Sequence, residues 1–95
     1  METTIYLAWS SEPIPADLVG PWTELRVLAD DLVVVEGTES LSRVYHEIKW
    51  SLPDDAALLV TPLTERPKLK YLPDGTTTWF RDRLPPQAEP GRDDD

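Results

Sequence analysis

The sequence predicts a small α+β domain whose core is one four-stranded antiparallel sheet. Two short runs, residues 3–10 and 32–36, are apolar in both side-chain directions, which is typical of strands buried on both faces. Residues 38–52 have apolar side chains at helical spacing and lie between the second of these runs and a third apolar run. With 40% hydrophobic residues and four tryptophans, the 95-residue chain is too apolar for a disordered protein.

The first half of the chain is expected to form three strands. After the first strand, three prolines and a glycine leave room for at most a short helix around Ala16–Val19. The runs Leu25–Leu28 and Leu32–Glu36 flank the triplet Ala-Asp-Asp, whose aspartates suit a tight turn. These two runs are therefore expected to pair as a hairpin.

The most regular helical pattern begins after Thr38 or Ser40, either of which suits the N-cap, and ends before Pro53. His46 falls on its polar side, where a surface histidine is expected. Trp50 lies outside the core-facing stripe, so it either folds under the chain or is an exposed aromatic of the kind enriched at interfaces. The stripe itself consists of Leu41, Val44, Tyr45, Ile48 and Leu52.

The third apolar strand, residues 56–63, is followed by an irregular or edge stretch around Pro67, which cannot donate a ladder hydrogen bond. Arg66, Lys68 and Lys70 alternate in this stretch. On an extended segment they would point the same way, which makes them the candidate nucleic-acid contacts. Basic residues on an edge strand also prevent sheets from aggregating, and the sequence leaves both roles open.

A short helix over residues 76–84, capped by Asp74 or Thr76, is expected to close the fold. Residues 1–84 then form a single domain. The acidic, proline-rich residues 85–95 are expected to be a disordered tail.

In order, these elements read strand, short helix, hairpin, helix, strand, which is the βαββαβ order of the ferredoxin-like fold. In that arrangement two helices cover one face of the sheet, and the C-terminal helix is an addition. The other face is apolar too, so something has to bury it. We expect a homodimer through this open face, unless the C-terminal segment folds back over it. The predicted interface residues are Ile5, Leu7, Trp9, Val33, Val35 and Trp50.

The composition excludes most kinds of chemistry. The chain has no cysteine, which rules out disulfides, thiol nucleophiles and thiolate zinc sites, and its single histidine rules out a multi-histidine metal site. The pairs Asp30-Asp31 and Asp54-Asp55 fall in predicted turns, where aspartate serves backbone hydrogen bonding. No phosphate-binding glycine loop, Ser-His-Asp set or HExxH motif occurs, so we expect no cofactor and no enzyme.

The charge and the termini of the sequence bound its partners and location. Eighteen acidic against nine basic residues give a net charge of −9, which opposes non-specific attraction to nucleic acid and to anionic membranes. No run of about 18 apolar residues occurs, and the N-terminus "METTIYL" lacks the basic start of a signal peptide. A cytoplasmic protein without membrane contact is therefore expected.

The chain from Val27 to Leu84 resembles the CRISPR-associated protein 2 superfamily, in particular relatives outside CRISPR loci. The resembling features are a strand that ends before a serine- or threonine-capped helix, a paired-aspartate turn, the strand "ALLVTPLT", and a closing pattern of Gly75, Trp79 and Phe80. The resemblance implies a homodimer with its sheets facing inward.

Catalytic members of that superfamily have a Tyr-Asp pair at the end of the first strand, which helps the dimer to hold a divalent metal. Here Trp9 and Ser10 take those two positions. A serine hydroxyl is a poor ligand for a hard cation, although Glu12 could supply a displaced carboxylate. We therefore predict a non-catalytic homodimeric interaction module that lost its nuclease site. The alternatives are a metal-dependent endonuclease of that superfamily, or an acidic antitoxin-like or nucleic-acid-mimic partner protein.

Overall fold

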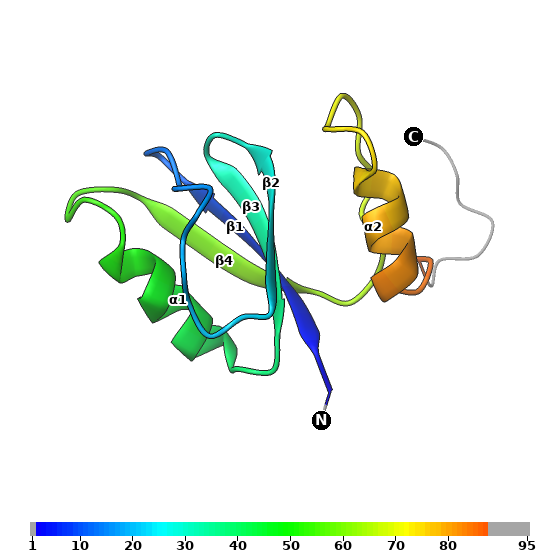
Figure 1. The fold of residues 1–95 in the computed structure, drawn as a ribbon, viewed down its shortest axis with the longest axis horizontal. Coiled ribbons are helices and arrows are strands. Elements are labelled where there is room, and N and C mark those ends of the chain that lie inside the picture. The colour runs from blue at the N-terminus through cyan, green and yellow to red at the C-terminus, as the bar shows by residue number, and fades with distance from the viewer. Residues whose placement is uncertain (1, 88–95) are drawn as a thin grey trace.

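The computed structural model describes residues 2–87, which form four strands and two helices (Figure 1). In chain order these are β1 (Thr4–Ser10), β2 (Glu24–Ala29), β3 (Leu32–Gly37), α1 (Leu41–Trp50), β4 (Leu58–Leu63) and α2 (Thr76–Arg83). Of the predicted tail, residues 88–95 lie outside the described residues. The start of the tail contacts the domain, because the Arg66 N–H donates to the Pro85 carbonyl at 2.9 Å.

The predicted four-stranded antiparallel sheet is confirmed, with the strand order β2-β3-β1-β4. The strands β1 and β3, which are apolar on both sides, are the two inner strands, as their patterns predicted. The predicted hairpin is β2 and β3, with a register shift between Val27 and Ala29.

The connection between β1 and β2 contains no helix, so the prediction of a short helix around Ala16–Val19 is wrong. Only a turn at Ala16 and Asp17 is present, and the Leu18 N–H donates to the Pro15 carbonyl at 3.3 Å. Prolines fix φ and supply no N–H donors, and four residues are too few to offset the cost of helix nucleation.

The α1 helix covers one face of the sheet, which we call the α1 face. Ser40 is its N-cap and accepts a hydrogen bond from the Arg43 N–H at 3.2 Å, as one of the two predicted caps. The predicted stripe is buried at Val44, Ile48 and Leu52, whereas Leu41 in the first turn remains exposed. The sheet residues in this core are Tyr6, Ala8, Val33 and Val35.

The opposite face, which we call the α2 face, is covered by α2 and the loop before it (Figure 1). Its core joins Ile5, Leu28 and Val34 from the sheet to Trp79, Phe80 and Leu84. The prediction of an open sheet face is therefore wrong, and the alternative, a C-terminal segment that folds back, is what the structure shows. A sheet that is apolar on both sides needs two covers, and this chain supplies both itself.

Ionic contacts add to the attachment of α2. Arg83 lies between Glu24 and Glu36, at 3.0 Å from each carboxylate, and 4.1 Å over the Trp79 ring. Partial burial by itself lowers the pKa of Arg83, but the hydrogen bonds and charges of Glu36 and Glu24 outweigh it and raise the pKa. The guanidinium is therefore a permanent cation between the carboxylates of β2 and β3.

The start of α2 differs from the prediction. Gly75 is the N-cap, with a positive φ of 88°, and no side chain caps the helix. The Thr76 hydroxyl donates instead to the Pro73 carbonyl at 2.7 Å, and Arg26 donates to the Asp74 carbonyl at 2.8 Å. Neither α1 nor α2, the helices of the described residues, has the length and apolarity to span a membrane.

Candidate interaction surface

The outer edge of β4 is the main backbone feature left open by the fold. The Ser11 N–H donates to the Ala57 carbonyl at 3.0 Å. With the β1–β4 register, this bond shows which residues of β4 form hydrogen bonds with β1 and which do not. Alternate residues of β4 therefore turn their backbone groups toward β1, and the others turn them outward. The outward set consists of Leu58, Val60 and Pro62. Pro62 thus occupies a position where its missing N–H costs the β1–β4 ladder nothing.

The two edges of the sheet are protected to different degrees. The edge strand β2 carries Glu24 and Arg26 and has a register shift. These two charged residues contact α2 and the loop before it, which we call the α2 segment. In contrast, residues 56–64 contain no charged side chain, and Leu59 is 59% exposed. Charges and bulges are the usual protection of edge strands, so β4 is the edge that suits pairing.

Exposed apolar side chains adjoin this edge on the α2 face. Leu32, Trp9 and Leu59 are cross-strand neighbours and form one row at the margin of the α2 segment. Trp9 is 39% exposed and Leu32 is half-buried. An apolar groove of about 140 Å³ between Leu7, Leu32 and the loop at Leu69 borders the row. The row thus extends the apolar surface from the edge onto the sheet.

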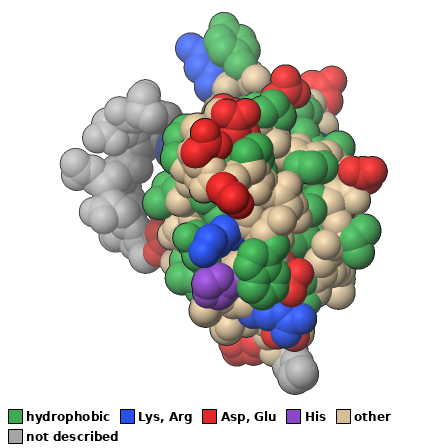
Figure 2. Space-filling model, turned by 90° about the vertical axis from the view of Figure 1, so that its left-hand side faces the viewer, with side chains coloured by type: hydrophobic (Ala, Val, Ile, Leu, Met, Phe, Trp, Pro, Cys, Tyr) green, Lys and Arg blue, Asp and Glu red, His purple; other side chains and the backbone are tan. Residues whose placement is uncertain are grey.

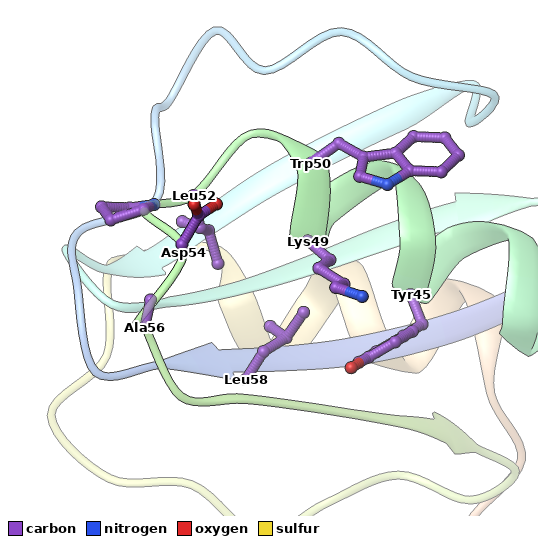
Figure 3. A pocket seen from close by; sticks show the side chains of 8 residues that line it. Tyr45, Lys49, Trp50, Leu52, Asp54, Ala56 and Leu58 are labelled. Carbon is purple, nitrogen blue, oxygen red and sulfur yellow. The ribbon is translucent and has the colours of Figure 1, made fainter.

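On the α1 face, a hollow of about 410 Å³ lies between α1 and β4 (Figure 3). Figure 3 shows Tyr45 and Lys49 pointing from α1 toward the β4 side of the hollow, with Leu58 beneath them. The Trp50 ring points away from it. The remaining lining residues are Leu52, Pro53, Asp54 and Ala56. With one lysine, one aspartate and no histidine in its lining, the hollow offers no recognisable catalytic set.

Trp50 is 70% exposed, so the second of its two predicted environments, an exposed aromatic, is the one found. Its ring stacks on His46 with the centroids 5.8 Å apart, and the Tyr45 ring contacts His46 edge-on with the centroids 5.1 Å apart. Figure 2 shows the histidine on a face where hydrophobic and charged side chains are mixed. His46 is half-buried at the surface of α1, where a surface histidine was predicted, and it contacts these two aromatic rings.

At the end of β1, Ser10 and Glu12 form a turn. Ser10 is fully buried, and its hydroxyl accepts a hydrogen bond from the Glu12 N–H at 3.0 Å. The Ser10 N–H donates to the Asp31 carbonyl at 3.1 Å. The Glu12 side chain is exposed, and residues 2–87 contain no group of three or more histidines and carboxylates that could hold a metal ion. The Ser10 hydroxyl thus stabilises the local backbone turn after β1.

The two aspartate pairs lie in turns, as predicted. Asp30 and Asp31 connect β2 to β3, and the Asp30 carbonyl accepts from the Ile14 N–H at 2.8 Å. Asp54 and Asp55 lie in the turn before β4. Through the contacts of Ser10, Ser11 and Ile14, these turns meet the β1–β2 loop at one end of the sheet, which is therefore acidic.

The basic trio does not form one row, because its segment is irregular and Arg66 is engaged elsewhere. The Arg66 guanidinium donates to the Leu84 carbonyl at 2.7 Å and to the Arg81 carbonyl at 3.3 Å, so it satisfies orphan carbonyls at the end of α2. Lys70 lies 5.1 Å over the Tyr71 ring, and Lys68 lines the groove on the α2 face. Arg66 thus has a structural role within the fold.

The predicted interface residues are divided between core and surface. Ile5, Val33 and Val35 are buried in the two cores of the chain itself, and Leu7 is half-buried under the α2 segment. The exposed members are Trp9 on the sheet and Trp50 on α1. Sequence reasoning missed Leu59, although the uncharged run around it was a signal of an unprotected edge.

Comparison with protein-family models, with curated proteins and with solved structures gave no match. A function for this chain is therefore inferred from its own geometry.

Proposed function

We propose that the chain is a small, non-catalytic interaction module that acts as a homodimer. The open edge of β4, with exposed Leu59 beside Trp9, is the observation that supports it most. An uncharged strand edge with apolar neighbours offers both hydrogen-bonding groups and hydrophobic area to another chain. Because the C-terminal segment covers the α2 face, the proposed contact moves from that face to this edge.

The order of the strands supports a relationship to the ferredoxin-like sheet of the CRISPR-associated protein 2 superfamily. The strand β3 lies between β1 and β2, as in a split βαβ unit, and β1 lies between β3 and β4. In this proposal a proline-rich loop replaces the first helix. The fold would then have been kept for association, without the metal-binding carboxylate.

The non-catalytic part of the proposal rests on the environments of Ser10 and His46. The Ser10 hydroxyl is buried in a turn, and His46 stacks on Trp50 and meets Tyr45 edge-on. A metal-dependent endonuclease would have to rely on Glu12, which stands apart from any cluster of ligands in the described chain. Incubation with labelled RNA and DNA in magnesium or manganese is expected to give no cleavage. Cleavage that disappears in Glu12→Gln would overturn this part.

A second candidate is an acidic partner that binds a basic protein, such as an antitoxin-like or nucleic-acid-mimic protein. It is favoured by the net charge of −9 and by the carboxylates of Glu12, Asp30 and Asp54 in the loops that meet at one end of the sheet. Binding to a basic target would weaken steeply with salt, because exposed charges are screened.

The homodimer is tested by light scattering or sedimentation at micromolar concentration. A mass twice that of the 10.8 kDa chain is expected. A monomer mass over the whole micromolar range would contradict the proposal and leave the acidic-partner function as the better candidate.

A further inference from the structure

We infer that two copies pair through β4, antiparallel to each other and related by a two-fold axis at Leu59, so that two four-stranded sheets become one eight-stranded sheet. This inference rests on the proposed homodimer and names the surface that forms it. It uses only backbone groups and side chains that the fold of one copy leaves exposed.

The hydrogen-bonding pattern of the β4 edge is self-complementary. The outward N–H and carbonyl groups of Leu58 and Val60 are spaced one residue apart on either side of Leu59. With the axis at Leu59, Leu58 of one copy faces Val60 of the other, and four N–H···O bonds form. All outward N–H donors of both strands are then satisfied. Pro62 lies outside these four bonds, so its missing N–H is not needed.

Side chains support the same register. Leu59, the exposed leucine of the strand, would meet its own copy in a pair without direct hydrogen bonds, where Cα atoms are about 4.5 Å apart and side chains are closest. Trp9 is its neighbour on β1 and flanks the contact on the same face. The apolar row of Leu32, Trp9 and Leu59 would then continue across the axis into the second sheet.

The hollow beside α1 is consistent with this arrangement. A two-fold axis perpendicular to a continuous sheet keeps both α1 helices on the same side. Tyr45 and Lys49 point from α1 toward the β4 side, where the second copy would lie (Figure 3). The hollow, which is open in one copy, would be closed by the same elements of the other.

Charge identifies a second copy as the occupant rather than a basic partner. Chains with a net charge of −9 repel each other, so they associate where charge is lacking, and residues 56–64 are uncharged. The nearest carboxylates along the chain, Asp55 and Glu65, lie beyond the two ends of the strand. A cationic partner would find no carboxylate along the strand itself. The edge therefore matches an uncharged strand of its own kind.

Cysteine cross-linking tests this register, because the chain contains no cysteine of its own. Under mild oxidation Leu59→Cys is expected to give a disulfide-linked dimer, since the two Cα atoms lie within the range of a disulfide. Val60→Cys serves as the register control, because its two copies would lie on the other face and too far apart. Val19→Cys, at an 88% exposed position in the β1–β2 loop, measures cross-linking by random collision.

A charge at the edge provides the second test. Leu59→Lys is expected to weaken self-association at least about tenfold, and the matched Val19→Lys to leave it unchanged, with folding of both checked by circular dichroism. A wild-type dimer that Leu59→Lys does not weaken, or that Leu59→Cys does not cross-link above the Val19→Cys level, would overturn this inference and leave the proposed homodimer standing. A wild-type monomer would overturn both.

Discussion

The α1 face and the α2 face of the sheet are covered in different ways. On the α1 face, one amphipathic helix buries Val44 and Ile48, and Leu52 just after it, without any ion pair to the sheet among the described contacts. On the α2 face, an eight-residue helix is also held by Arg83 and, through its end, by Arg66. A regular apolar stripe is enough to dock a helix, whereas a short helix with few apolar residues needs polar attachments as well.

The largest effect is expected on the α1 face. Ile48 is fully buried in the last turn of the helix, so Ile48→Ala should lower the free energy of unfolding by about 3 kcal/mol, through lost burial and the cavity left behind. Urea unfolding measures it. The control Trp50→Ala, on the same helix but exposed, should stay within about 0.5 kcal/mol. An Ile48→Ala cost below about 1 kcal/mol would mean that α1 is not docked by its stripe.

An intermediate effect is expected from Arg83→Ala on the α2 face. Glu24 and Glu36 are direct cross-strand partners, so removal of the cation leaves two carboxylates facing each other. The expected loss is about 1–2 kcal/mol, allowing for partial exposure of the pairs. It should shrink in about 1 M NaCl, where the Debye length is only about 3 Å. Urea unfolding of Arg83→Ala and Ile48→Ala at low and high salt measures this difference. The loss caused by Ile48→Ala should stay the same, because the cost of an apolar cavity does not shrink with salt.

The control for Arg83→Ala is Arg43→Ala. Arg43 also contacts two carboxylates, Glu39 and Glu47, but on the exposed surface of α1. Its removal should cost at most about 0.5 kcal/mol. Equal costs for the two arginines would show that Arg83 does not attach the α2 segment to the sheet.

The smallest effect is expected from Arg66→Ala, which removes the donors to the last carbonyls of α2. The predicted loss is about 1 kcal/mol, the usual net value of such hydrogen bonds. Hydrogen exchange should show faster exchange in α2 while α1 amides remain unchanged. Lys70→Ala, at an exposed lysine of the same segment, is the matched control and should change neither. Faster exchange in both helices would mean that the two covers unfold together.

The parts of the fold that followed from the sequence are those with a regular local pattern. Two-sided apolar strands predicted that β1 and β3 are inner strands, and the stripe at Val44, Ile48 and Leu52 predicted α1 and its core face. The helix at Ala16–Val19 was wrong because its prolines were weighed too lightly against the expected order of elements. The open sheet face was wrong because α2 is too short for its pattern to show which surface it covers.

The candidate site was predicted less well than the fold. All five of the following residues were assigned to an interface, but only two of them, Trp9 and Trp50, are exposed in the chain. Ile5, Val33 and Val35 lie inside it. Arg66 was grouped with Lys68 and Lys70 by spacing alone, whereas its role depends on the end of a helix 15 residues or more further along. Long-range polar contacts of this kind leave no local periodicity from which they could be inferred.

The sequence by itself determined that the chain forms a two-sided antiparallel sheet and that α1 docks on it. These properties depend on side-chain type and spacing over a few residues. Only the tertiary structure decided that the second face is covered by α2, that Arg83 and Arg66 hold this cover, and that the edge of β4 stays open. Those outcomes depend on which distant segments reach each other, and that is set by competition among all apolar surfaces of the chain at once.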